Sequence, residues 1–577
     1  MLKMGNHTTF VFDHILRLVY AQYTHYLPPR HVSSRTFYLF TLDYRFHRNN
    51  WPRCDTWRVP TEVRFLLLCL SDHESTWPTG NSPHTACIHI LDDDSLINIF
   101  HLYRPPIFGG DKDDLGGKWG RERWWHKLTQ VCQRWRNLIL ESSSHLGLCL
   151  LCTHGSPVAD MLALSPPLPL VIHYMDIDRD IIEAEEKGIV LALRQRRRVH
   201  RIRFLMPTRN LKRLIKAIDK EYPELECLTM MSSTGGFSEA WKLSTTFQAP
   251  HLRCLLLKGR MDFPARLMAT KSLVRLYLLI DGITFFCTPY TMFLCTSAMR
   301  QLETLQIIFD FPFSDYDAEK LLQRPIMSTL RMTHVTYPNL RWFEFQGASV
   351  YLEAFVQWIN VPRLEKLNIQ FKLSTRPTFF SVPHLLRFMD TAKNIRFDNA
   401  DFEFFIDRVS VGMNLREEEA HALSIAVYCA ALDWQVSSLA QIFYSLSQKM
   451  STVEYLNFES EGLDDEANRT EWRGLLKSLS NVKTLSVDVN LVGELSRCLR
   501  PNDGEHPLEV LPELQELSYT GGTGDIGERD TFTSFLDARQ NAGHPVNLLF
   551  LEQMDAWSSE AGSSEAGSSE AGSDFDT

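Results

Sequence analysis

The sequence has no run of apolar residues long enough to cross a membrane. A membrane-spanning helix needs about 20 of them, and the most apolar stretch, Arg64 to Leu70, is much shorter. The N-terminus also lacks an uninterrupted apolar segment with a small-residue cleavage site, so we expect no secretory signal. We therefore expect no membrane partner and a cytoplasmic or nuclear location.

An excess of positive charge is also missing. The 577 residues include 60 Lys and Arg against 70 Asp and Glu, which gives a net charge of −10. A surface that neutralises phosphates has to be basic, so this balance argues against a nucleic-acid partner. One basic cluster, Arg194 to Arg203, leaves nucleic-acid binding or nuclear localisation as alternatives. We interpret it as a solvated helix face that leads into a strand.

Motifs for catalysis and metal binding are absent as well. The sequence has no P-loop, no Gly-x-Gly-x-x-Gly after a strand, no His-Glu-x-x-His and no Gly-x-Ser-x-Gly. The 12 cysteines are scattered, and the one Cys-x-x-Cys, Cys149 to Cys152 near His154, has no second ligand pair for zinc. We interpret this stretch as a buried strand. We expect no catalytic residues, no metal, no cofactor and no enzymatic activity of the chain's own.

The composition that remains is that of a soluble globular protein. Apolar residues make up 44% and charged residues 23% of the chain, and its length predicts two or three folded units. Residues 1 to 88 show no sustained helical or strand period, so we expect a poorly ordered extension. Three copies of Ser-Ser-Glu-Ala-Gly, from Ser558 to Gly572, predict a disordered tail over residues 551 to 577.

Two amphipathic helices are predicted between Leu91 and Leu140. The first begins at a run of acidic residues that suits a helix N-terminus, and its apolar face consists of Leu96, Ile99, Phe100 and Tyr103. The second begins near Arg123 and has Leu128, Val131, Trp135 and Leu138 along one stripe. A loop is expected between them, from Ile107 to Gly120. So much apolar surface implies either a partner surface or the core of the module itself.

The residue identities in this stretch resemble an F-box. Leu91 to Phe100 resembles the motif's opening, an acidic pair followed by a Leu/Ile run that ends in Ile-Phe, and Val131 to Arg136 resembles its closing Val-Cys-x-x-Trp signature. The run is similar, down to Leu164 to Leu170, to the F-box-like proteins expanded in mushroom-forming fungi. Asp92 stands where the family usually has proline, and the loop between the helices is long.

From Val199 onward the chain repeats the phrase apolar-x-x-apolar-x-apolar. Copies begin at Val199, Leu225, Leu252, Leu273, Leu302, Leu340, Leu364, Val453, Val482 and Leu514, with a weaker copy at Ile395. Helical stretches lie between copies, as at Asn210 to Glu221, Tyr351 to Ile359 and Ser437 to Ser447. One strand and one helix every ~20–30 residues is the unit of a leucine-rich-repeat solenoid.

These observations predict an α/β fold in which a small helical module precedes an irregular solenoid. We expect an open horseshoe with a continuous parallel sheet on its concave side. The asparagine of the regular repeat occurs only at Asn490. The predicted divisions are an extension (1–88), an F-box-like module (89–145), a repeat domain (146–550) and the tail (551–577).

The resemblance implies the substrate-recognition subunit of an SCF-type ubiquitin ligase, which binds a Skp-type adaptor and, through it, a cullin. Carried over position by position, the adaptor-binding face is Leu91, Leu96, Ile99, Phe100, Leu128, Val131, Cys132 and Trp135. Strand positions between the apolar ones are candidates for binding a target protein: Arg253, Arg275, Arg341, Trp342, Glu365 and Lys366. The alternative is a repeat scaffold with a degenerate F-box and no ligase partner, which Asp92 favours.

Overall fold

The computed structural model describes residues 91–103, 124–232, 240–261, 270–281, 288–309, 334–372, 382–418, 420–461, 467–501, 506, 508–521 and 531–552. The chain divides into two compact units, residues 1–150 and 151–577. The predicted N-terminal extension, the loop from Ile107 to Gly120 and the tail beyond residue 552 lie outside the described residues.

Within the described part of the first unit there are three helices, α4 (Asp93–Tyr103), α5 (Trp124–Leu128) and α6 (Gln133–Glu141). The first predicted helix is confirmed by α4. The second was predicted as one helix and is two, because Cys132 adopts an extended conformation and its Sγ accepts a hydrogen bond from the Trp135 N–H at 3.5 Å. This is the arrangement of an N-cap, so a new helix starts there.

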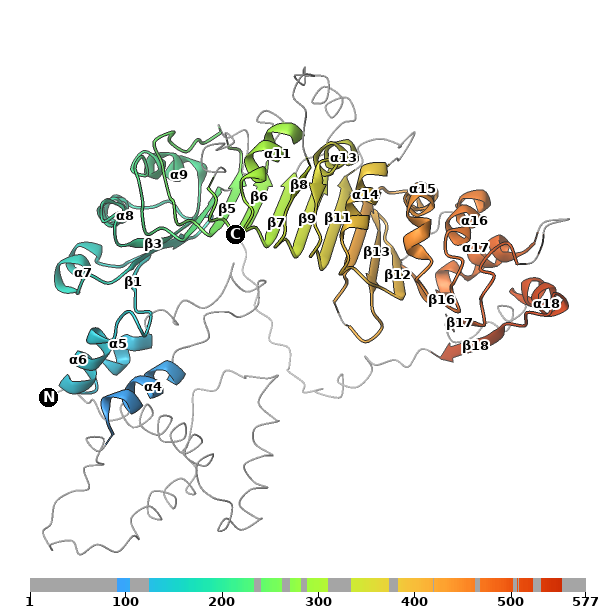
Figure 1. Ribbon diagram of the computed structural model, residues 1–577, viewed down its shortest axis with the longest axis horizontal. Coiled ribbons are helices and arrows are strands. Elements are labelled where there is room, and N and C mark those ends of the chain that lie inside the picture. The colour runs from blue at the N-terminus through green and yellow to red at the C-terminus, as the bar shows by residue number, and fades with distance from the viewer. Residues whose placement is uncertain are drawn as a thin grey trace, which may run out of the picture. The chain divides into compact units, whose positions relative to one another are not determined.

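The second unit is built on one large sheet (Figure 1). Its strands, in spatial order, are β1 (Leu150–Cys152), β2 (Leu170–Met175), β3 (Val199–Met206), β4 (Cys227–Ser232), β5 (Cys254–Gly259), β6 (Arg275–Ile280), β7 (Thr304–Phe309), β9 (Trp342–Gly347), β11 (Lys366–Lys372), β14 (Leu423–Tyr428), β13 (Arg408–Asn414), β12 (Asn399–Phe404), β15 (Tyr455–Ser460), β16 (Thr484–Asp488), β17 (Glu516–Gly521) and β18 (Asn547–Glu552). A separate pair joins β8 (Val335–Thr336) to β10 (Ile359–Asn360).

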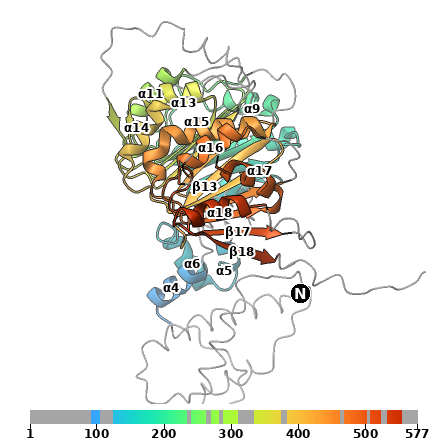
Figure 2. The ribbon, with the colours of Figure 1, turned by 90° about the vertical axis from the view of Figure 1, so that its right-hand side faces the viewer.

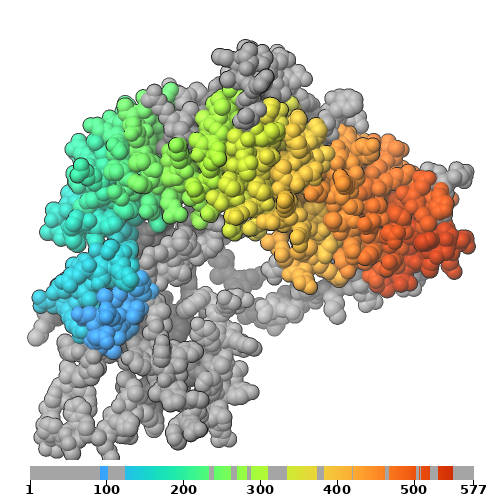
Figure 3. Space-filling view, in the orientation of Figure 1, coloured from blue at the N-terminus to red at the C-terminus, as the bar shows by residue number. Residues whose placement is uncertain are grey.

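Helices follow many of these strands and line one face of the sheet (Figures 1 and 2). They are α7 (Val158–Leu164), α8 (Glu183–Arg194), α9 (Thr208–Ile215), α11 (Pro289–Ser297), α13 (Ser349–Val356), α14 (Pro383–Thr391), α15 (Leu432–Met450), α16 (Arg469–Lys477), α17 (Val489–Leu499) and α18 (Thr533–Asn541). None of the helices in the described ranges is long and apolar enough to cross a membrane. Successive repeats pack against each other without a break along the unit (Figure 3).

The alternation of the sequence explains why only one sheet face carries helices. In β5, β6, β7 and β9, every second side chain is buried and those between are half-buried. Strands covered on both faces read as continuous apolar runs, whereas period-two alternation gives one buried face. The apolar positions of the repeated phrase are therefore the core, formed between sheet and helices.

The repeated phrase predicts most of the strands correctly. Each copy beginning at Val199, Leu225, Leu252, Leu273, Leu302, Leu340, Leu364, Val453, Val482 or Leu514 coincides with a strand of the sheet. The weaker copy at Ile395 was misplaced, because the strand is β12 and its buried positions Ala400 and Phe402 continue a phrase that starts at Phe397. The strands β2, β8, β10, β13, β14 and β18 were not predicted.

From β2 to β18 the sheet is parallel except at β13, which corrects the prediction of a continuous parallel sheet. β13 pairs antiparallel with both β12 and β14, while β14 pairs parallel with β11. The chain therefore leaves the row after β11, forms β12 three strand positions further on, and turns back through β13 before β14 fills the place beside β11. A short turn after Phe404 permits the hairpin, which a parallel crossover could not make so tightly.

Asn490, at the start of α17, has the role that the regular repeat predicts for this asparagine. Its side-chain amide donates to the backbone carbonyl of Ser460 in β15 at 3.2 Å. That bond satisfies a carbonyl of the preceding repeat and ties two repeats together.

Candidate functional site

Five of the eight side chains predicted to bind an adaptor lie in the interior of the helical module, which we define as residues 91–103 and 124–147. Leu96, Ile99, Phe100, Leu128 and Trp135 are all at most 2% exposed. The rings of Phe100 and Trp135 meet edge to face, with centroids 4.9 Å apart, and so join α4 to α6. These residues hold the module together.

The other three predicted adaptor residues, Leu91, Val131 and Cys132, are half-buried. They lie at the entry to α4 and in the turn between α5 and α6. Part of each side chain is therefore accessible. Any contact that these motif positions make with another protein has to start from this edge of the module.

Asp92, which replaces the proline of the F-box pattern, caps α4. Its Oδ1 accepts a hydrogen bond from the Ser95 N–H at 2.7 Å, and this bond holds the pKa of the Asp92 carboxyl below its usual value. The carboxylate thus satisfies one of the N–H groups left open at a helix start. Proline has no comparable acceptor, so Asp92 is a functional alternative to it as a helix start.

Arg134 connects the two ends of the motif, a role that the sequence analysis missed. Its guanidinium donates to Asp93 Oδ1 at 2.7 and 3.1 Å and to the Leu91 carbonyl at 2.6 Å. Both partners lie at the start of α4, while Arg134 belongs to α6. The signal was present in sequence, because Arg134 is one of the two variable residues in the closing signature and Asp93 one of the acids in the opening.

A second candidate surface is the face of the sheet opposite the helices, which we call the outward face. Register places residues of neighbouring strands in continuous rows on it. One row runs Arg201, Cys227, Cys254, Arg275, Thr304, Trp342 and Lys366, and the next runs Arg203, Thr229, Leu256, Tyr277, Gln306, Glu344 and Asn368. The first row consists of the third residue of each copy of the repeated phrase.

The chemistry of the outward face changes along the chain. Basic residues concentrate on β3 to β6, apolar and aromatic ones on β5 to β9, and acidic ones on β12 to β17. The half-buried apolar and aromatic side chains are Leu256, Tyr277, Leu279, Ile308 and Trp342, and the acidic ones are Asp401, Glu403, Glu459, Asp488 and Glu516. A large aromatic and apolar patch bordered by charge is the composition of protein-binding surfaces.

Hydrogen bonds fix the polar side chains in the middle of this face. Glu344 accepts from Gln306 at 2.8 Å and from Asn368 at 3.2 Å, one neighbour on each side. Burial raises the pKa of the Glu344 carboxyl, and the Gln306 amide partly opposes that effect. Further along, Tyr428 donates to Gln370 at 3.3 Å. The middle of the outward face is therefore held in one arrangement before any partner arrives.

The six residues predicted to bind a target divide between two surfaces. Arg275, Trp342 and Lys366 lie in the first row of the outward face. Arg253, Arg341 and Glu365 come just before their strands and are exposed at the sheet edge, where Arg341 and Glu365 form an ion pair at 3.4 Å. Arg253 borders a hollow of about 400 Å³ at this edge, together with Glu226.

A larger hollow, of about 580 Å³, lies among the acidic strands. Glu403, Asn457, Glu459 and Asp488 line it, with Phe404 and Phe458. The Asn457 amide donates to Glu459 at 2.9 Å. On β12, burial raises the pKa of the Asp401 carboxyl, and the charge of Glu459 adds to the rise. The charge of His421 and hydrogen bonds from Asn457 and Asn399 oppose it.

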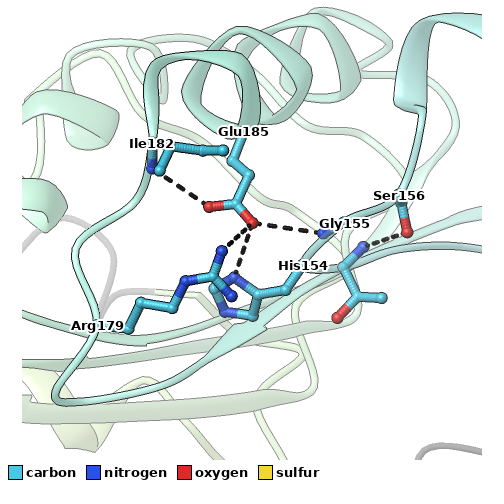
Figure 4. A network of polar contacts seen from close by, with 7 residues as sticks. His154, Gly155, Ser156, Arg179, Ile182 and Glu185 are labelled. Carbon is cyan, nitrogen blue, oxygen red and sulfur yellow. Dashed lines mark hydrogen bonds and ion pairs between the residues drawn. The ribbon is translucent and has the colours of Figure 1, made fainter.

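The region around the Cys-x-x-Cys forms a polar joint (Figure 4). Cys152 is buried in β1, and the described residues contain no group of three or more His, Cys, Asp or Glu that could hold a metal. Glu185 of α8 accepts bonds from Arg179 at 3.0 Å, from the Ile182 N–H at 3.3 Å and from the Gly155 N–H at 3.4 Å, and contacts His154 Nδ1 at 3.3 Å.

The electrostatics of this joint favour the charged carboxylate. Burial by itself would raise the pKa of Glu185, but the Ile182 N–H, the His154 ring and the Arg179 charge together lower it. The joint anchors the loop after β1 to α8. Nearby, Arg198 of the predicted basic cluster donates to the carbonyls of Leu168 at 3.0 Å and Pro166 at 3.2 Å, which is a structural role.

Comparison with known proteins gives little beyond the geometry. No protein-family model matches the chain, and no curated protein matches it significantly. Among solved structures, the leucine-rich repeat-containing protein LegL7 from Legionella pneumophila aligns at 10% identity, over 67% of this chain and 97% of that one, with a TM-score of 0.24. That likeness is weak, and the repeat architecture follows from the strand register itself.

Proposed function

We propose that this chain is a non-catalytic recognition subunit of an SCF-type ubiquitin ligase. The helical module would bind a Skp-type adaptor linked to a cullin, and the outward face would bind a target protein. The observation that carries the proposal is the pairing of an F-box-like module with a repeat sheet whose outward face keeps partly accessible side chains on β5, β6, β7 and β9.

The adaptor half of the proposal is supported by how the motif residues come together. The opening and closing segments, which are separated in sequence, meet through the Phe100 and Trp135 rings and through Arg134 and Asp93. The half-buried Leu91, Val131 and Cys132 would contact the adaptor. The buried motif residues would act indirectly, because they hold that edge in position.

The target half is supported by the outward face. Its rows of side chains are fixed by strand pairing and by hydrogen bonds such as those of Glu344, so little ordering is needed on binding. Trp342 and Tyr277 are the aromatic anchors that such a surface would use. A target held there would meet the ubiquitin carrier at high effective concentration, and ubiquitin transfer would be accelerated by proximity alone.

Co-purification of the full-length chain with a Skp-type adaptor tests the adaptor half. We expect a stable complex, and we expect Val131→Asp to weaken it at least tenfold because a charge enters the accessible edge. Asn137→Asp adds the same charge at an exposed position of α6 and should bind normally. Trp135→Asp is a poor test, since Trp135 is 1% exposed and its loss would unfold the module.

The alternative is a repeat scaffold for protein interaction that recruits no ligase. The cap formed by Asp92 favours it, because the helix start is complete without the usual proline. A folded full-length chain that binds partners through the outward face but no adaptor would support this alternative. Affinity purification followed by mass spectrometry, with wild type and Trp342→Thr side by side, reports adaptor and target in one experiment.

A further inference from the structure

Two cysteines from neighbouring strands lie side by side on the outward face. Cys227 begins β4, Cys254 begins β5, and the two are direct partners in the strand register. Neighbouring strands run about 4.8 Å apart, which is within the range of Cα separations, roughly 4.4–6.8 Å, that a disulfide bridges.

Arginines flank this pair on both sides. Arg201 is the register partner of Cys227 on β3, and Arg275 is the partner of Cys254 on β6. Arg203 occupies the next outward position of β3. Positive charge beside a thiol favours the thiolate, which is the reactive form.

The two thiols differ in pKa. The neighbouring Cys254 thiol lowers the pKa of Cys227 against the effect of burial, and the charges of Arg203 and Arg201 lower it further. The pKa of Cys254 is raised by its neighbour Cys227 and by burial. A reactive thiolate beside a second thiol is the arrangement in which a sulfenic acid condenses to a disulfide.

Other cysteines in the described ranges have a different environment. Burial raises the pKa of Cys429 and that of Cys498 to about 12 each, and burial also raises the pKa of Cys295. Buried thiols of this kind are inert. They provide an internal comparison for the reactivity of Cys227 and Cys254.

We propose that Cys227 and Cys254 are a redox-active dithiol that a peroxide oxidises to a reversible disulfide between β4 and β5. The Cys227 sulfur attacks one peroxide oxygen, the O–O bond breaks, and the departing hydroxide takes a proton to become water, which leaves a sulfenic acid. The Cys254 sulfur then attacks the Cys227 sulfur, the S–O bond breaks, and a second water departs. Two thiols and one hydrogen peroxide become one disulfide and two waters.

The oxidant has to be small. Cys227 is 8% exposed and Cys254 is half-buried, so hydrogen peroxide can approach where a protein disulfide could not. The bond would lock two strands beside Leu256 and Tyr277 and change the basic and apolar part of the outward face. The proposal concerns this face alone and does not depend on an adaptor.

Peptide mapping of the wild-type full-length chain tests the proposal. The protein is treated with hydrogen peroxide at pH 7, remaining thiols are blocked with N-ethylmaleimide, and the peptides are separated without reductant. We expect a Cys227 to Cys254 cross-linked peptide that dithiothreitol removes, while Cys429 and Cys498 stay reduced. Both thiols remaining open to alkylation after unfolding, or over-oxidation without a cross-link, would overturn the proposal.

A pair of variants tests the order of the steps. In Cys254→Ser the sulfenic acid at Cys227 has no partner, so dimedone should label it, whereas wild type should label weakly. Arg201→Gln with Arg203→Gln should raise the pH midpoint of Cys227 alkylation, because both positive charges favour the thiolate. Circular dichroism confirms that the variants are folded, and an unchanged midpoint would contradict the role of the arginines.

Discussion

The helical module and the repeat sheet use their apolar side chains differently. In the module, the motif positions Leu96, Phe100 and Trp135 are almost completely buried, so the accessible motif positions are confined to a narrow edge. In the sheet, every second strand position is buried and the others, such as Tyr277 and Trp342, stay on the outward face. A repeat of period two therefore separates stability from recognition, whereas a short helical motif combines them.

The sharpest test of this separation uses two adjacent residues of β9. Phe343→Ala should lower the free energy of unfolding by about 3–5 kcal/mol, because it leaves a cavity where a 1% exposed ring packed. Trp342→Thr, which copies the residue that the register places beside it, should cost about 1 kcal/mol or less. Urea unfolding followed by circular dichroism measures both. Equal losses would show that the outward face also carries stability.

In the module, by contrast, one buried ring, that of Trp135, should affect both stability and adaptor binding. Trp135→Ala should cost about 3–5 kcal/mol, and adaptor capture should fall with it. Trp135→Phe should cost about 1.5 kcal/mol or less, since the contact with Phe100 survives and the buried indole N–H has no acceptor to lose. Hydrogen exchange of α4 and α6 reports the local effect. A large loss in the Phe variant would point to a requirement for the indole itself.

The joint around Glu185 should depend on pH. Its folded pKa is lowered, so the carboxylate stabilises the fold above the pKa of the unfolded chain, and this contribution is lost as the pH falls through the folded value. Glu185→Gln should cost about 1–3 kcal/mol at pH 7 and less at pH 3. Urea midpoints across this pH range measure the difference. Glu183→Gln, on the same helix but exposed, is the matched control.

The smallest effect is expected at the start of α4. Asp92→Ala removes the acceptor for the Ser95 N–H and should increase hydrogen exchange in the first turn of the helix. Asp92→Asn keeps an acceptor and should leave exchange close to wild type. Asp92→Pro introduces the proline of the F-box motif, and stronger adaptor binding by that variant would mean that this proline serves the partner and not the helix.

The sequence predicted the repeats well because the apolar positions alternate with the strand. It also contained the dithiol, since Cys227 and Cys254 both occupy the third position of a phrase and the register makes those positions neighbours. Spacing along the chain alone made them look scattered. The two cysteines are neighbours because β4 pairs with β5, and a local sequence pattern does not show which strands pair.

Other features depended on side-chain bonds that no periodicity reports. The break between α5 and α6 follows from the Cys132 cap, and the clamp of Arg134 on Asp93 crosses from one helix to another. β13 was not predicted, because its alternation of Val409 and Val411 with polar residues does not form a copy of the repeated phrase. A local pattern can indicate a strand and still leave its direction open.

The reversed strand β13 has a consequence for how the chain reaches its folded state. In a regular solenoid each repeat contacts only its neighbours, so folding can propagate one unit at a time and fragments that end between units are viable. Here β11 pairs with β14, which comes later in the sequence than β12 and β13. β12 comes before β14 in the sequence and pairs with β15 on the far side of this hairpin. At this point folding requires a long-range loop closure between β11 and β14, which raises the contact order locally. A fragment ending after β13 lacks β14, so β12 and β13 cannot join the sheet at β11, and it should aggregate. A fragment ending after β15 contains every strand of the crossing and should remain soluble.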